Sequence, residues 1–301
     1  MTLNLHHLRV FSAVAECGSF TQAATALRIS QPAVSKSVQE LERQVAVALL
    51  ERAGRSSRLT PAGEALAAHA RELFSVEASA EEELRALRGL EHGSLRIGAS
   101  TTIATYMLPP ILSRFRQAHP GVVVRVVSAN TRAIARRVLE RRLDIALVEG
   151  PVAHPRLETI AWREDELALI AHPDHPLTRR RRVDAADLVG EPLIIRESGS
   201  GTREVGERAL AELGVTLTAA LQLGSTEAVQ QGVAAGLGIA IVSRAAAADL
   251  LALGRVAVVR LRGIVLQRSL CELRLRGRNS SVAARAFGSY LHPSAPPTPP
   301  L

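Results

Sequence analysis

The chain has 301 residues with 47% hydrophobic and 3% aromatic content and a formal net charge of +8. This length allows about two or three domains, and the composition is typical of a helix-rich α/β protein. Because no apolar run reaches about 18 residues and the N-terminus lacks a secretory pattern, we expect a cytoplasmic protein with no membrane partner. Cys17 and Cys271 have no metal-ligand spacing around them, so we expect reduced thiols and no metal site.

The positive charge by itself does not predict nucleic-acid binding. Residues 1–90 hold ten basic and ten acidic side chains, so the whole excess lies further along the chain. All but one of the 37 basic residues are arginine, which indicates a compositional bias. A claim of DNA binding therefore depends on a local motif.

The N-terminal segment predicts three helices. Residues 5–16 form the first, residues 21–27 the second, and residues 28–30 a tight turn into the third. Ser30 is placed to cap the third helix and Pro32 to occupy its first helical position, where the missing N–H costs nothing. We expect a small core beneath these helices made of Leu5, Leu8, Val10, Phe11, Val14, Phe20, Ala24, Leu27 and Ile29.

The third helix has one apolar and one polar face. Val34, Val38, Leu41 and Val45 recur at spacings of four, three and four, which places them on one buried face. The outward residues are Gln31, Pro32, Ser35, Lys36, Gln39 and Arg43. Such a face can enter the major groove of DNA and offer amide, hydroxyl and ammonium groups. The alternative is an ordinary helical hairpin with a solvated face.

Two short strands follow, at 49–52 and 58–60, around a turn at 53–57. A two-stranded wing carrying Arg52, Arg55 and Arg58 can touch the phosphate backbone or the adjacent minor groove. The alternative is a solvated loop. Beside a recognition helix we favour the wing.

Five motifs in order give this region a family resemblance. They are GSFTQAA at 18–24, SQPAVS at 30–35, LE at 41–42, LLER at 49–52 and RLTPAG at 58–63. Together they resemble the winged helix-turn-helix of LysR-type transcriptional regulators, which implies DNA binding. From the outward helix face and the wing we assign this role to Gln31, Pro32, Ser35, Lys36, Gln39, Arg52 and Arg55. The chain departs from the family at Ala46, where the family usually has Gly, and at Leu50, where it usually has Phe.

A long helix is expected from Thr60-Pro61 to about residue 90. Six of the seven heptad positions 66, 70, 73, 77, 80, 84 and 87 are apolar, the exception being Glu77. Because this pattern suits a two-helix coiled coil, we predict a homodimer whose two recognition helices read an inverted repeat.

The remainder of the chain alternates between strands and helices. Strands are expected at 94–99, 122–128, 144–149, 157–163, 166–171, 192–195, 217–223, 239–242 and 270–275, and helices at 102–117, 131–142, 202–213, 226–235 and 282–291. This alternation predicts parallel sheet with helices on its faces, in two lobes crossed twice by the chain. The Pro-rich segment 293–301 is expected to be disordered.

Small hydroxyl residues follow three strands of this part. They are Ser100, Thr101 and Thr102; Ser198, Ser200 and Thr202; and Ser225 and Thr226. At helix N-termini such residues favour an anion, and Arg196 and Arg203 can add donors. Glu149 ends another strand, and its carboxylate either faces the cleft, where it would favour an ammonium or hydroxyl donor, or pairs with an arginine.

A second resemblance covers this part. LRIGAST, LDIALVEG, RESGSGTR, LGSTEAV and AAGLGIAIVSR resemble the effector domain of LysR-type regulators, closest to the branch of sulfur-assimilation and carbon-fixation regulators. The family's effector domain is similar to type II periplasmic binding proteins, which implies an inducer site at Ser100, Thr101, Thr102, Ser200, Thr202, Ser225 and Thr226. To these we add Glu149.

The expected organisation is a winged helix-turn-helix at 1–60, a linker helix at 61–91 and an effector domain at 92–292. Its first lobe covers 92–163 and 268–292, and its second lobe covers 164–267.

Other protein classes fit the sequence less well. Ser198 stands where a nucleophile elbow requires its first Gly. Gly236 precedes a strand, whereas the glycines of a dinucleotide-binding fingerprint follow one. His172 and His175 lie in a Pro-bounded loop without further metal ligands. We therefore expect no enzyme and no cofactor, but a transcriptional regulator. Its expected partners are double-stranded DNA, a small and anionic effector, a second copy of the chain and RNA polymerase; a dimer of dimers stays open. The alternative is a ligand-binding protein or an enzyme on a two-lobed α/β scaffold.

Overall fold

The computed structural model describes residues 2–53, 56–86, 93–150, 152–212, 214–215, 219–263, 266–278 and 280–292. The chain divides into two compact units, residues 1–84 and 85–301, which are taken separately below. In the described part of the chain, no helix is both long enough and apolar enough to cross a membrane. The expected tail at 293–301 lies outside the described residues.

The first unit contains the three expected helices and the expected hairpin. Its elements are α1 (Leu5–Cys17), α2 (Phe20–Leu27), α3 (Gln31–Val45), β1 (Leu50–Ala53), β2 (Ser56–Leu59) and most of α4 (Pro61–Ala86). The predicted five-residue turn of the wing is wrong, because Ala53 pairs with Ser56 and the ladder leaves only two residues between the strands. The hairpin is therefore tighter than the sequence indicated.

The core of the first unit matches the prediction except at its edges. Leu8, Phe11, Val14 and others are buried, but Leu5 is 52% and Ile29 is 38% exposed. Leu3 packs against the core ahead of α1. Ile29 follows the left-handed residue Arg28, where the chain changes direction after α2.

Backbone contacts explain several motif residues. The Glu42 carboxylate accepts hydrogen bonds from the N–H groups of Leu49 and Leu50 at 2.8 and 3.1 Å. Thr60 caps α4, because its Oγ1 accepts from the Gly63 N–H at 3.0 Å. A Cβ on Gly63 would lie 2.0 Å from the Leu49 carbonyl oxygen, so this position requires glycine.

The long helix α4 lies on its own unit at its N-terminal end. Ala67 and Ala70 are buried there. Further along, Glu77 pairs with Arg9 of α1, whose guanidinium also lies 4.3 Å from the centre of the Phe74 ring. Only the later apolar positions, among them Val76 and Leu84 at 61% and 67% exposure, lack cover in the described chain. The first half of α4 therefore packs on its own unit.

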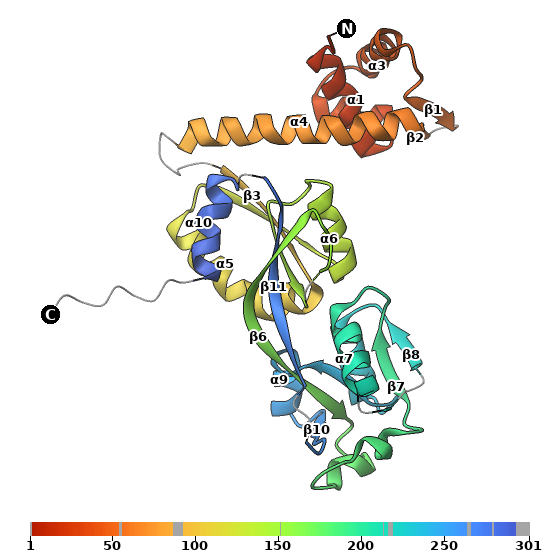
Figure 1. Cartoon of the computed structure of the whole chain (residues 1–301), viewed down its shortest axis with the longest axis vertical. Coiled ribbons are helices and arrows are strands. Elements are labelled where there is room, and N and C mark those ends of the chain that lie inside the picture. Colours follow the sequence, from red (N-terminus) through yellow and green to blue (C-terminus); the bar gives the residue numbers. More distant parts are fainter. Residues whose placement is uncertain are drawn as a thin grey trace, which may run out of the picture. The chain divides into compact units, whose positions relative to one another are not determined.

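The second unit has two lobes joined by two long strands (Figure 1). Lobe I contains β3 (Gly93–Ala99), a π-helical turn (Ile103–Met107), α5 (Leu108–Ala118), β4 (Val122–Ser128), α6 (Thr131–Leu139), β5 (Ile145–Glu149) and α10 (Val282–Leu291). Lobe II contains β7 (Leu193–Arg196), α7 (Gly201–Glu212), β8 (Ala219–Leu223), α8 (Thr226–Ala234), β9 (Ala240–Ser243), α9 (Arg244–Ala252), β10 (Ala257–Val259) and 3₁₀ turns at Pro176–Arg179 and Ala185–Leu188.

The connecting strands are β6 (Leu157–Ala171) and β11 (Gln267–Leu275), which pair antiparallel. The sequence predicted two strands where β6 runs unbroken, and it missed α9 and β10. The sheet order is β10-β6-β11-β5-β3-β4, with β9 also paired to β6. β3 runs parallel to β4 and β5, and β7 runs parallel to β8, as the alternation predicted.

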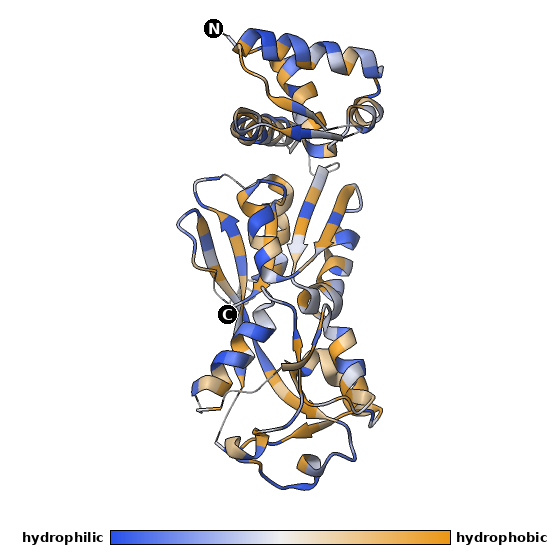
Figure 2. Ribbon diagram, turned by 90° about the vertical axis from the view of Figure 1, so that its right-hand side faces the viewer, coloured by the Kyte–Doolittle hydropathy of each residue, from blue (hydrophilic) through white to orange (hydrophobic). Residues whose placement is uncertain are grey.

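Both lobes place apolar residues between sheet and helices. Every residue of β5 is buried, while the helices combine a buried and an exposed side, with hydrophobic and hydrophilic residues mixed around them (Figure 2). Pro109 and Pro110 lie in the first turn of α5, which begins after the π-helical turn, so this pair of prolines marks a new helix start. This packing leaves the ends of β3, β5 and β7 to carry polar side chains.

Candidate functional site

The first polar surface is the outer face of α3. The Ser30 hydroxyl accepts from the Ala33 N–H at 3.3 Å, as the sequence predicted, and Pro32 is the second residue of α3, one position later than predicted. Val34, Val38 and Leu41 are buried and Val45 is half-buried. The opposite face is thereby fixed toward solvent.

The predicted DNA-contacting residues of α3 share that face. Gln31, Pro32, Lys36 and Gln39 are exposed and Ser35 is half-buried. Arg43 hydrogen-bonds the Glu40 carboxylate, and this bond holds the pKa of Glu40 below its usual range. The remaining face offers amide, hydroxyl and ammonium groups, which match base edges and phosphates.

The wing lies after α3 in the chain. Arg58 is exposed on β2. The side chain of Arg52 and the whole of Arg55 lie outside the described residues. Their predicted roles therefore stay predictions.

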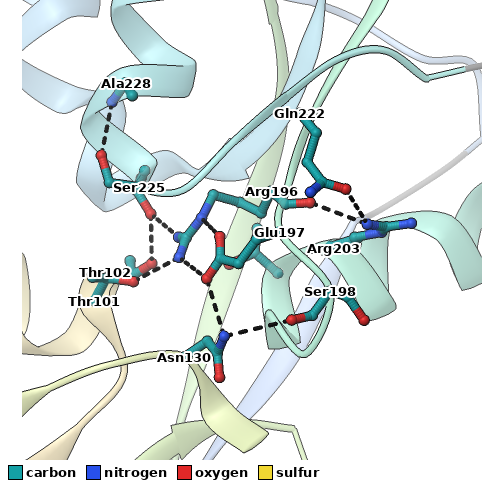
Figure 3. A network of polar contacts seen from close by, with 12 residues as sticks. Thr101, Thr102, Asn130, Arg196, Glu197, Ser198, Arg203, Gln222, Ser225 and Ala228 are labelled. Atoms are coloured by element: carbon teal, nitrogen blue, oxygen red, sulfur yellow. Dashed lines mark hydrogen bonds and ion pairs between the residues drawn. The ribbon is translucent and has the colours of Figure 1, made fainter. Parts of the chain in front are cut away.

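The second polar site lies between the lobes and is centred on Arg196 at the end of β7 (Figure 3). Its side chain is 5% exposed, and the guanidinium donates to Thr226 Oγ1 at 2.7 Å and to Thr101 Oγ1 at 2.9 Å. Thr102 and Thr226 lie 3.3 Å apart through their hydroxyl oxygens. A buried cation is thus surrounded by hydroxyl groups from two of the three predicted strand-to-helix junctions, one in each lobe.

The other partner of Arg196 is the next residue, Glu197. Arg196 donates from Nε and Nη2 to the two carboxylate oxygens of Glu197, at 2.8 and 2.9 Å. Asn130 Nδ2, from lobe I, donates to Glu197 Oε1 at 3.3 Å. Partial burial works to raise the pKa of Glu197, but the hydrogen bonds that it accepts outweigh burial and leave the pKa below its usual range.

Polar groups without partners lie near this site on both lobes. Ser100 and Gln230 are 1% and 3% exposed, and Ser100 Oγ and Gln230 Nε2 have no hydrogen-bond partner among the described residues. The Tyr106 hydroxyl donates to Gln230 Oε1 at 3.4 Å. Burial, helped by the charge of Glu227, raises the pKa of Tyr106 to about 12. Buried polar groups usually have hydrogen-bond partners, so Ser100 Oγ and Gln230 Nε2 are exceptions within the described residues.

Two of the predicted residues, Thr202 and Glu149, contact a second buried cation, Arg268, and not Arg196. Arg268 of β11 donates to Asp165 of β6 at 2.8 Å and to Thr202 Oγ1 at 2.7 Å, and its Nη1 lies 3.7 Å from Glu149 Oε1. Thr131 donates to the other oxygen of Glu149 at 3.1 Å. Of the two roles considered for Glu149, the structure shows the pairing with an arginine.

The two remaining predicted residues occupy junctions. Ser225 caps α8, because its Oγ accepts from the Ala228 N–H at 3.1 Å. Ser200 is buried in the loop before α7. Gly201, the first residue of α7, approaches lobe I so closely that a Cβ would lie 2.6 Å from the Glu149 carbonyl oxygen.

The sequence prediction omitted three residues that the geometry brings in. Asn130 caps α6 after β4, so it belongs to a fourth strand-to-helix junction that the same rule identifies. Neither Glu197 nor Arg268 caps a helix, so the sequence contained no such signal for them. Arg268 in particular lies inside a strand, 103 positions from its partner Asp165.

The histidines of the 172–175 loop stabilise a turn. Nδ1 of His172 accepts from the Asp174 N–H at 3.2 Å, and Nδ1 of His175 accepts from the Leu177 N–H at 3.3 Å. Within the described ranges, no group of three potential metal-binding His, Cys, Asp or Glu side chains occurs. Both cysteines are free thiols, Cys271 buried and Cys17 half-buried.

Family models match both units of the chain. Residues 5–64 match the family model of bacterial regulatory helix-turn-helix proteins of the lysR family, and residues 88–296 match that of the LysR substrate binding domain. A RuBisCO operon transcriptional regulator of Allochromatium vinosum is 35% identical over 97% of this chain and 96% of its own.

Solved structures agree with this assignment. The regulatory domain of CcmR from Synechocystis PCC6803, in complex with 2-PG, is 30% identical, has a TM-score of 0.63, and is matched over 66% of this chain and 96% of its own. A full-length OxyR variant from Pseudomonas aeruginosa has a TM-score of 0.78 over 97% of this chain and 94% of its own, and at 23% identity it shows the fold alone.

These matches decide between the classes considered above. They cover both units, and the relatives are transcriptional regulators, which sets aside the enzyme reading. The chain therefore belongs to the LysR family: it is a DNA-binding transcriptional regulator with a helix-turn-helix domain followed by an effector-binding domain.

Proposed function

We propose that the chain acts as a homodimer that reads an inverted repeat in promoter DNA. The DNA-binding part is residues 1–60, and residues 61–91 form the linker through which two chains pair. The exposed apolar residues late in α4, such as Val76 and Leu84, support this pairing, because they have no cover in the described chain. A two-fold axis then places two copies of α3 in successive major grooves.

The proposed DNA contacts divide by chemistry. Gln31 and Ser35 read base edges, Lys36 and Gln39 add charge and hydrogen bonds, and Pro32 packs at the start of the helix. Arg52 and Arg55 of the wing bind phosphates. The side chains that the structure places at the surface of α3 support the first group. In this proposal the DNA-bound protein also contacts RNA polymerase, and two dimers can associate. The protein acts in the cytoplasm, where bacterial DNA lies.

The effector in this proposal is a small anionic metabolite held between the two lobes of residues 92–292. One observation carries it: the guanidinium of Arg196 is buried between hydroxyls of both lobes. A buried cation of this kind suits a carboxylate or phosphate. Ser100, Thr101, Thr102, Ser200, Ser225 and Thr226 supply neutral donors around it, while Glu149 and Thr202 contribute through the Arg268 cluster at the strand crossing. The 2-PG complex of the CcmR regulatory domain also supports a small ligand.

The mechanism follows from the lobes. Ligand contacts to both lobes would favour one lobe arrangement, shift how dimers associate, and thereby change spacing or bending at the promoter. Footprinting of the full chain on its own upstream region, with and without 2-PG, tests this. We expect a ligand-dependent change in the protected region for the wild-type chain and none for Arg196→Gln. Should the footprint and transcription be unchanged across a panel of anionic metabolites, the effector role would be wrong.

A further inference from the structure

The contact between Arg196 and Glu197 has the same geometry as the contact of an arginine with an anionic ligand. Two nitrogens of one guanidinium face the two oxygens of one carboxylate, at 2.8 and 2.9 Å (Figure 3). This bidentate arrangement is also the one by which arginine binds a free carboxylate or phosphate. The anion-binding side of Arg196 is therefore already filled by the chain itself.

We propose that the Glu197 carboxylate is an intramolecular competitor of the effector, which occupies the place of the ligand's anionic group until the ligand displaces it. The ligand class is a small molecule with a carboxylate or phosphate head. The inference rests on the proposed role of Arg196 as the anion-binding residue, and it adds how that residue is regulated.

The two members of the pair differ in how firmly they are fixed. Arg196 is 5% exposed and is tied to Thr226 and Thr101 by hydrogen bonds of 2.7 and 2.9 Å, one to each lobe. Glu197 is 26% exposed, and its contact with Asn130 is 3.3 Å long. The guanidinium therefore stays in place while the carboxylate has access to water, which solvates it after displacement.

Displacement of Glu197 also changes the contact between the lobes. Asn130 caps α6 of lobe I and donates to Glu197, which follows β7 of lobe II. A ligand that takes over the guanidinium removes this link and replaces it with its own contacts. Binding and lobe arrangement are then coupled through one side chain, because the ligand has different contacts in the two states.

The test measures the affinity of inorganic phosphate for the full chain by isothermal titration calorimetry, with acetate in a second arm. Glu197→Gln removes the competing charge with little change of shape. Glu166→Gln is the matched control, because it removes the same charge from a surface carboxylate that pairs with Arg244 and not with Arg196. Arg196→Gln removes the binding group. If Glu197 covers Arg196 in about nine of ten molecules, its removal tightens the apparent affinity about tenfold.

The expected result is phosphate or acetate binding about tenfold tighter in Glu197→Gln than in wild type, unchanged in Glu166→Gln and lost in Arg196→Gln. The anion whose affinity increases more in Glu197→Gln identifies the head group of the ligand. Equal or weaker binding in Glu197→Gln, or no saturable binding of either anion, would overturn the proposal. Glu197→Ala is read in the same way if the Gln variant fails to fold. Operator binding by the wild-type chain is measured separately, so a failure of the regulator function stays distinguishable.

Discussion

Ala46 carries backbone strain that a single substitution relieves. It ends α3 with φ 55° and ψ 28°, in the left-handed region, and it is exposed. A side chain in this region costs about 1–2 kcal/mol relative to a right-handed conformation. Glycine avoids that cost but loses about 0.4–1 kcal/mol through the greater freedom of its unfolded chain. Ala46→Gly should therefore stabilise the first unit by about 1 kcal/mol, and no packing is lost.

Hydrogen exchange of the full chain, read by mass spectrometry, is the suitable assay. The single tryptophan, Trp162, lies in the second unit, so its fluorescence does not report on α3. A gain of about 1 kcal/mol slows exchange about fivefold in peptides of α1 to α3 that exchange by opening of the unit. Ala68→Gly, at an exposed interior position of α4, is the control and should destabilise by about 1 kcal/mol. Unchanged or faster exchange in Ala46→Gly would refute the reasoning.

Three further predictions follow from other sites. Arg268→Met leaves two buried carboxylates without their cation and should destabilise the second unit by about 3–5 kcal/mol. Urea unfolding followed by Trp162 fluorescence measures this, and a decrease in the free energy of unfolding below about 1 kcal/mol would contradict it. Because the pKa of Tyr106 is raised from 10.0 to about 12, the stability that it contributes is complete below pH 10 and falls as the pH rises toward 12. Tyr106→Phe should reduce that fall in thermal denaturation, and an identical fall in both proteins would argue against it. Gln31→Ala should cost about 1–3 kcal/mol of discrimination between base pairs in binding titrations. Arg55→Ala should weaken binding to all duplexes alike and lower the slope of log affinity against log salt concentration by about 1. The reverse pattern would exchange the roles of the two residues.

Local chemistry made much of the fold predictable. Ser30 and Thr60 cap helices where the sequence placed their starts, and the spacing of Val34, Val38 and Leu41 identified the buried face of α3. Such signals depend on residues three or four apart, so a single sequence contains them. Even α9 had one, since Ser243 caps it directly after β9.

Long-range pairing explains what the sequence could not predict. The acidic run around Asp165 made β6 look like two strands, because a charged residue is expensive to bury alone. In the structure Asp165 is 5% exposed, since Arg268 of β11 neutralises it from 103 positions away. The same cation pairs with Glu149, and so the sequence alone could not decide between the two roles considered for that carboxylate.

The regulator function is tested most directly by the binding of the full chain to DNA. Fluorescence anisotropy at one fixed salt concentration compares fragments of its own upstream region with random duplex of the same length. We predict a preference of about a thousandfold or more for one fragment that contains an inverted repeat. Equal affinity for all fragments and for random duplex would contradict the account.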